Sequence, residues 1–166
     1  AATSTGSRSE SAAGASTAGG GGGGVGTATL SGRSLLSAAS RPPEATLDMS
    51  DTYLGVRGLL AVISTIPLMP RLRRVVFRAA GLDSVTLALL CHACRTLRFL
   101  EEFDVSDNPA ASSIGGEAVA GLCGRLSSLV EVRVDGVEMI RPTFRKIEAR
   151  IGANRVRVEE LRSRRG

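Results

Sequence analysis

Four stretches of this sequence align under one another at a nearly constant spacing, and this repeat constrains the fold more than any other feature. At successive offsets of 28, 28 and 29 residues, the stretches begin at Glu44, Leu72, Leu100 and Leu129. Apolar and polar residues alternate within each stretch, which is the periodicity of a half-buried β-strand. Apolar residues at helical spacing follow these strand-like stretches. A strand–helix unit that recurs at this period predicts an array of units that bury one another's apolar faces.

The same alignment predicts which strand residues form the hydrophobic core. The fourth and sixth positions of every stretch are apolar, and side chains two residues apart on a strand lie on one face. We therefore expect the strands to be held in register by Leu47, Met49, Val75, Phe77, Phe103, Val105, Val132 and Val134. Helices are expected over residues 56–66, 84–97, 116–126 and 142–151, and a final strand-like cap is expected around Val156 and Val158.

The composition divides the chain into four segments. Residues 1–29 are almost entirely Ala, Gly, Ser and Thr, with too little apolar surface to offset the entropy of ordering, so we expect a disordered tail. Residues 30–43 end at two prolines and are interpreted as an N-terminal cap or a degenerate repeat. Residues 44–140 hold the four repeats, and residues 141–166 hold a C-terminal helix, a cap and a basic tail. Because the first residue is Ala1, we expect a fragment of a longer protein or a processed product.

The third stretch carries a family resemblance. From Leu100 to Asn108 it reads Leu-x-x-Phe-x-Val-x-x-Asn, which resembles a leucine-rich repeat, and a 28-residue period with a full helix is similar to the ribonuclease-inhibitor-like subclass. The resemblance covers about residues 44–140. It implies an α/β solenoid, a short horseshoe with parallel strands on the concave face and helices on the convex face, and it implies protein partners. Across the four units, the column of the family's asparagine reads Thr52, Ala80, Asn108 and Val137.

Cys91 and Cys94 form a C-x-x-C motif, which can be a redox pair or half of a zinc site. Either chemistry needs partners, and the chain offers only Cys123 and His92 in addition. The repeat provides another interpretation, because the cysteines align with apolar helix positions of other units, namely Ile63, Ile66 and Ala120. We therefore expect buried core cysteines, with a redox pair or a metal site as the alternatives. Three cysteines also indicate a reducing compartment, and hence an intracellular, cytoplasmic location.

The glycine run at residues 19–24 satisfies the spacing G-x-G-x-x-G only because every residue in it is glycine. A dinucleotide site needs a strand before such a loop and a helix after it, and the sequence predicts neither there. We therefore expect no cofactor. No apolar run approaches the length of about 20 residues that a membrane-spanning helix needs, so we expect no membrane span.

The strand positions that face away from the predicted core carry charged residues. Neighbouring strands lie about 4.8 Å apart, so acidic and arginine side chains from successive units should alternate across this face. Paired carboxylates can hydrolyse glycosides, but adjacent arginines favour the ionised forms, and we expect no enzymatic activity. The face is either a self-neutralising ladder of ion pairs or a docking surface for a protein of complementary charge. The candidate partner-binding residues are Asp48, Arg74, Arg78, Glu102, Asp104, Arg133 and Asp135.

Positive charge is concentrated at the C-terminal end. Residues 141–166 contain nine basic and three acidic residues, against twelve basic and thirteen acidic residues in the rest of the chain. Two functions are consistent with this sequence. One is a non-enzymatic protein-interaction module that acts through the charged strand face. The alternative is a structural or scaffolding segment of a larger protein whose basic end binds an acidic polymer: a protein tail, a lipid or, less favoured because no aromatic residue is placed to stack on bases, a nucleic acid. The basic candidates are Arg141, Arg145, Arg157, Arg164 and Arg165.

Overall fold

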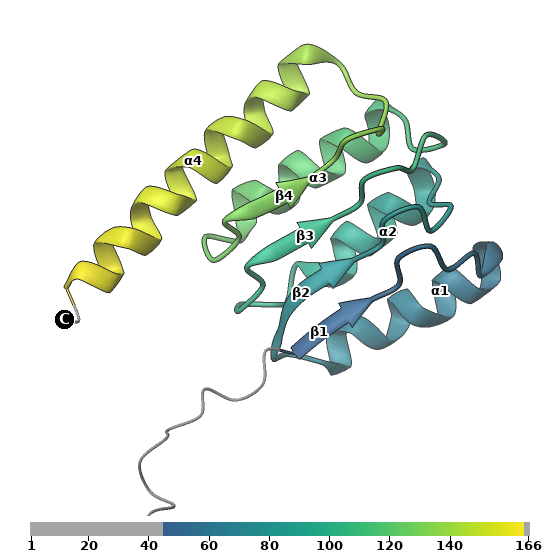
Figure 1. Ribbon diagram of the computed structural model, residues 1–166, viewed down its shortest axis with the longest axis horizontal. Coiled ribbons are helices and arrows are strands. Elements are labelled where there is room, and N and C mark those ends of the chain that lie inside the picture. The colour runs from purple at the N-terminus through teal and green to yellow at the C-terminus, as the bar shows by residue number, and fades with distance from the viewer. Residues whose placement is uncertain (1–44, 165–166) are drawn as a thin grey trace, which may run out of the picture. The chain divides into compact units, whose positions relative to one another are not determined.

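The computed structural model describes residues 45–164, in which strands and helices alternate along the chain (Figure 1). The predicted tail over residues 1–29, the predicted cap over residues 30–43 and the glycine run lie outside the described residues. The elements are β1 (Ala45–Asp48), α1 (Gly55–Thr65), the 3-10 helix η1 (Ile66–Leu68), β2 (Leu72–Val76), α2 (Ser84–Cys94), β3 (Glu102–Asp104), α3 (Ser113–Arg125), β4 (Glu131–Arg133) and α4 (Arg141–Ser163).

The strands form one parallel sheet in the order β1-β2-β3-β4, and α1, α2 and α3 lie side by side behind it (Figure 1). Leu47 lies opposite Val75, Val75 opposite Phe103, and Phe103 opposite Val132. These pairs are the ones that the sequence offsets of 28, 28 and 29 residues predict, so the predicted register is confirmed. The coarse fold class, α/β with a parallel sheet, is confirmed with it.

The repeat continues in the backbone beyond the ends of the strands. Phe77 N donates to Asp104 O at 2.8 Å and Val105 N donates to Arg133 O at 3.0 Å, which extends the parallel ladder by one residue. Every unit then turns through one residue in the left-handed region, at the same position of each stretch. These residues, with φ between 49° and 75°, are Asp51, Ala79, Asp107 and Gly136. Only the last of them is a glycine, the residue that adopts this conformation most readily. The sequence alone therefore indicates the turn in one unit of four.

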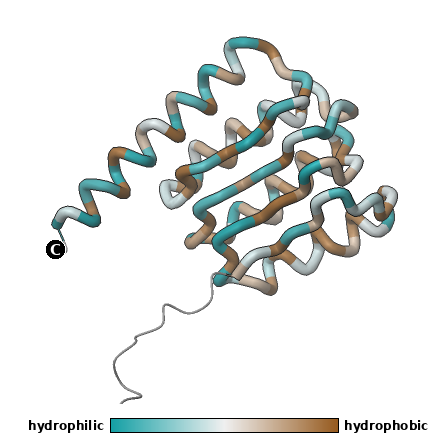
Figure 2. Tube along the Cα trace, viewed as in Figure 1, coloured by the Kyte–Doolittle hydropathy of each residue, from teal (hydrophilic) through white to brown (hydrophobic). Residues whose placement is uncertain are grey.

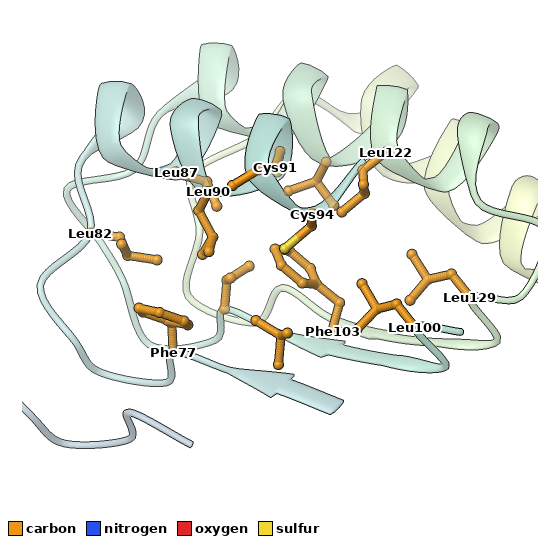
Figure 3. Packing of buried hydrophobic residues seen from close by; sticks show 14 of the residues in the cluster. Phe77, Leu82, Leu87, Leu90, Cys91, Cys94, Leu100, Phe103, Leu122 and Leu129 are labelled. Atoms are coloured by element: carbon orange, nitrogen blue, oxygen red, sulfur yellow. The ribbon is translucent and has the colours of Figure 1, made fainter. Parts of the chain in front are cut away.

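The core lies between the sheet and the helices (Figure 3). Five of the eight predicted core residues are buried, and the other three are partly buried: Leu47 and Met49 in the first unit and Val132 in the last. Hydrophobic residues recur on each strand and on the helices that cover it (Figure 2). Leu82, Leu87 and Leu90 approach Phe77 from the loop and helix of the same unit (Figure 3).

The cysteines belong to this core, as predicted. Cys91, Cys94 and Cys123 are buried free thiols. Burial raises the pKa of Cys94 and of Cys123 to about 12, and raises the pKa of Cys91 well above its usual value. A protonated, buried thiol is a poor nucleophile, so the environment of these cysteines is that of small apolar core groups.

The C-terminal segment corrects one expectation. The predicted helix ends before Gly152 and is followed by a strand-like cap at Val156 and Val158, but α4 is one continuous helix of 23 residues that includes all three. Gly152 sits in the helix with no neighbouring atom near its missing side chain. The helix is held beyond that point by Asn154, whose amide donates to the carbonyls of Leu126 and Leu129, both at 2.9 Å. The alternation of valines there therefore falls on a helix rather than on a strand.

Candidate protein-interaction surface on the strand face

The strand face is formed by the side chains that point away from the helices. In Figure 2, the strands carry hydrophilic as well as hydrophobic residues. Because the units are in register, side chains from equivalent positions stand in rows that cross the sheet. The predicted partner-binding residues all belong to these rows or to the turns that follow them.

Arg74 and Glu102, which lie opposite each other on β2 and β3, form the central ion pair of this face. Arg74 Nη2 donates to Glu102 Oε1 at 3.1 Å, and Arg74 Nε lies 2.7 Å from Oε2, in an ion-pair contact that is too poorly aligned to be a hydrogen bond. The arginine side chain is 44% exposed, whereas the carboxylate side chain is 13% exposed. The positive member of the pair therefore meets solvent and covers the negative member.

Arg133, on β4, bridges three carboxylates. Its Nη2 lies 2.5 Å from Glu131 Oε1, and its Nη1 lies 3.4 Å from Asp104 Oδ2 and 3.6 Å from Glu102 Oε1. The hydrogen bond that Arg133 donates to Glu131 is the largest cause that raises the pKa of Arg133, with smaller contributions from Glu102 and Asp104. Its guanidinium is thus held in place above the acids of β3.

Asp104 lies on the strand face but is covered by its neighbours. Its side chain is only 5% exposed. Its Oδ1 accepts hydrogen bonds from the backbone N–H of Ser106 at 2.9 Å and from the Ser106 hydroxyl at 2.6 Å, while Oδ2 faces Arg133. The alternation placed Asp104 correctly on the strand face, but the neighbouring side chains cover it. Asp104 therefore positions Arg133 and Ser106 rather than presenting its own charge.

Asp48 repeats this local arrangement in the first unit, where it is exposed. Its Oδ1 accepts from the backbone N–H of Ser50 at 2.9 Å and from the Ser50 hydroxyl at 2.6 Å. These two hydrogen bonds, the hydroxyl first, lower the pKa of Asp48, and Arg74 lowers it further. Asp48 is therefore an exposed, ionised carboxylate at the β1 side of the face.

Arg78 makes an ion pair that the sequence did not predict. Its Nε donates to Asp107 Oδ2 at 2.8 Å, and both side chains are more than half exposed. This hydrogen bond is the main cause that raises the pKa of Arg78, followed by the charges of Asp107 and Asp51. Asp107 occupies the turn position with left-handed backbone, which also holds Asp51 in the first unit. The recurrence of aspartate at this turn position in two units was the sequence pattern from which Asp107 could have been predicted.

Asp135 lies apart from the ion pairs. It is exposed, and it makes no ion pair with any of residues 45–164. It lines a hollow between the end of β4 and the first turns of α4, together with Met139, Arg141, Phe144, Arg145 and Glu148.

Within the part of the chain that the structure describes, no group of three His, Cys, Asp or Glu residues is arranged to hold a metal. Over the same residues, no helix has the length and apolar character of a membrane span.

The predicted site is thus brought together in part. Arg74, Glu102, Asp104 and Arg133 form one network with Glu131, which was not among the predicted residues. Arg78 pairs with Asp107 instead. Asp48, at the β1 edge of the sheet, and Asp135, at the β4 edge, lie on either side of the network. The resulting surface presents arginines at its centre and exposed acids at its sides.

Comparison with known proteins gives a likeness of fold. No family model matches the chain, and no curated protein sequence matches it. A solved structure described as "Leiomodin-1 Actin-Binding Site 2 (ABS2)" superposes with a TM-score of 0.53 at 8% sequence identity, and the match covers 75% of this chain and 90% of that chain. At this level of identity, the chain is similar to that structure in its fold alone.

Proposed function

We propose that this chain is a non-enzymatic protein-interaction module of the leucine-rich-repeat kind, similar to the ribonuclease-inhibitor-like subclass. The regular strand–helix alternation, the matching strand register and the recurrent left-handed turn support a solenoid of this kind. Repeat arrays present extended surfaces for binding other proteins. The description of the similar structure as an actin-binding site agrees with a role in protein binding.

The observation that carries the proposal is the fixed position of the arginines on the strand face. Arg74, Arg78 and Arg133 are each 44–57% exposed, and each is in contact with a carboxylate of a neighbouring unit. An arginine that is already ordered loses less side-chain entropy when a partner binds. Arginine is also among the residues that dominate binding energy at protein interfaces. We infer that the partner places acidic or hydrogen-bond-accepting groups over these guanidinium groups.

The same ion pairs argue for binding rather than catalysis. A general acid needs a carboxyl group that keeps its proton near neutral pH. Here the carboxylates of β3 lie against arginines, and the pKa of Asp48 is lowered. A carboxylate such as Asp48, which its hydrogen bonds and Arg74 hold in the ionised form, suits electrostatic recognition rather than proton donation.

The test compares two charge reversals of equal size. Purified actin, monomeric and filamentous, is the first probe because of the similar structure's description, and an extract of the source cells is the second. Arg78→Glu changes the strand face at an exposed pair, so it should leave the fold intact and weaken partner binding by about tenfold. Arg57→Glu, on the exposed side of α1, is the matched control and should leave binding unchanged.

A partner that binds both variants as tightly as the wild-type protein would exclude the strand face as the docking surface. Circular dichroism and thermal unfolding of each variant show whether the fold is retained. If actin fails to bind while binding of a protein from the extract depends on Arg78, the proposal of a protein-interaction module stands and actin is excluded as its partner.

A second candidate function is a scaffolding segment whose basic end binds an acidic polymer. It is favoured by the observation that α4 carries seven basic and three acidic residues on a single exposed helix. Binding of this kind should weaken steeply with added salt. It should respond to charge reversals on α4 and not to Arg78→Glu, so the two functions can be distinguished.

A further inference from the structure

Helix α4 is anchored to the rest of the protein over residues 141–155. Its buried residues, Thr143, Ile147 and Ile151, all lie there, and Lys146 pairs with Glu117 of α3. The anchor ends with Asn154 and with Arg155, whose Nε donates to Val130 O at 2.7 Å. Figure 1 shows the remaining turns extending away from the sheet. They span about 12 Å at 1.5 Å per residue.

The apolar stripe that anchors α4 does not stop where the anchor stops. Ile147, Ile151, Asn154, Val158 and Leu161 follow one another at intervals of four and three residues, which is the spacing of a heptad seam. Ile147 and Ile151 are buried, Val158 is half-buried and Leu161 is 49% exposed. The last two thus continue the seam on the part of the helix that projects.

Arginines border this seam on both sides. One flank carries Arg150, Arg157 and Arg164 at intervals of seven residues, and the other carries Arg155 and Arg162. All five are exposed. In paired helices these flanking positions lie opposite the flanking positions of the partner helix and select the partner by charge. Acidic side chains at those positions attract, and basic ones repel.

This charge pattern decides between the possible occupants of the seam. A second copy of the chain would place arginines against arginines. Residues 1–44 carry two acidic residues, Glu10 and Glu44, against three arginines, and so are not acidic either. An acidic helix with its own apolar stripe matches both the seam and its flanks.

We infer that the projecting C-terminal end of α4 binds an acidic amphipathic helix of another protein. The inference rests on the second candidate function and specifies that the acidic polymer is a helix of another protein. Val158 and Leu161 supply the apolar contact, while Arg157 and Arg164 on one side and Arg162 on the other pair with carboxylates. Because the exposed seam is short, the affinity should be moderate and sensitive to salt.

The test uses the full chain and a synthetic peptide about three heptads long, with leucine at the seam positions and glutamate at the flanking positions. The same peptide with lysine at the flanking positions is the charge control. Fluorescence anisotropy should show binding of the glutamate peptide, and at least tenfold weaker binding of the lysine peptide. Arg157→Glu combined with Arg164→Glu should weaken binding of the glutamate peptide by about tenfold, which corresponds to about 1.4 kcal/mol.

A matched pair of apolar substitutions tests the seam itself. Leu161→Asp should abolish most of the binding, because it places a carboxylate in the seam. Val156→Asp should not, because Val156, although 61% exposed, lies on the opposite side of the helix from the seam. Circular dichroism of both variants checks that α4 remains helical.

The inference would be overturned by equal loss of binding in the two Asp variants, by binding of the two peptides with equal affinity, or by no binding of the glutamate peptide. Polyglutamate, single-stranded DNA and anionic vesicles are the further probes. If they bind as tightly as the peptide and depend on the arginines but not on Leu161, the surface is a general polyanion site and the inference is wrong. Arg78→Glu should leave peptide binding unchanged, so failure here does not affect the proposal for the strand face.

Discussion

Asn108 shows what a single side chain contributes to this fold. It is fully buried, and its Oδ1 accepts from the backbone N–H of Leu82 at 2.9 Å. Its Nδ2 donates to the carbonyls of Phe77, Val105 and Ser106 at 2.8–3.0 Å. The side chain thus satisfies backbone groups of two neighbouring units in a place where water cannot reach them.

Replacing Asn108 by Ala should therefore lower the free energy of unfolding by about 2–4 kcal/mol, because buried backbone groups lose their partners. Thr52 occupies the same position of the first unit, is half-buried, and its hydroxyl donates to Ser50 O at 3.1 Å. Thr52→Ala is the matched control and should cost less than about 1 kcal/mol. Urea unfolding followed by circular dichroism measures both. Equal costs for the two variants would show that the amide has no special role.

Among the helices, α2 has the most complete N-terminal cap. Asp83 Oδ1 accepts from the Thr86 backbone N–H at 2.7 Å, and the Thr86 hydroxyl accepts from the Asp83 backbone N–H at 2.9 Å. The backbone hydrogen bond from Thr86 is the main cause that lowers the pKa of Asp83 below its usual value of 3.8. The N-cap residue of α3 is Ser112, whose side chain makes no capping hydrogen bond.

Asp83→Ala should destabilise the protein by about 1 kcal/mol at neutral pH, and Ser112→Ala by less. The folded Asp83 has a lower pKa than the unfolded one, so its stabilisation is fully present above 3.8 and is lost as the pH falls through the folded pKa. The difference between wild type and Asp83→Ala should therefore shrink at acidic pH. Thermal unfolding across a pH series measures it, and a difference that stays constant into the acid range would contradict the role of the carboxylate.

Across the whole molecule, each unit depends on the units beside it. Phe103 is fully buried and lies in the central row of the sheet, opposite Val75 on one side and Val132 on the other. Neither the strand nor the helix of one unit can bury its own apolar face, so stability is shared between neighbours.

Phe103→Ala should cost about 3–5 kcal/mol, as for other large-to-small changes in a core. Because the loss is shared, amide hydrogen exchange should accelerate in β2 and β4 as well as in β3. Leu68→Ala is the control: this side chain is 80% exposed, and its removal should change stability by less than about 0.5 kcal/mol. Faster exchange confined to β3 would show that the units fold independently.

For the candidate site, sequence alone placed residues on the correct face but did not determine how they interact. Arg74 and Glu102 were predicted as neighbours and are neighbours. Asp104 was predicted to be exposed and is buried, and Arg78 pairs with Asp107 rather than with an acid of the next strand. Alternation along a strand fixes the direction of a side chain, whereas its exposure depends on how far the long arginines of other units reach over it.

The sequence by itself determined the strand register and most of the core. Apolar residues that recur every 28 or 29 residues can all be buried only if Leu47, Val75, Phe103 and Val132 lie side by side. Only the tertiary structure decided the course of α4, since Asn154 finds its partners in the carbonyls of Leu126 and Leu129, more than twenty residues away. A local pattern predicts which side chains are buried. Which distant groups those side chains contact is determined only when the units pack together.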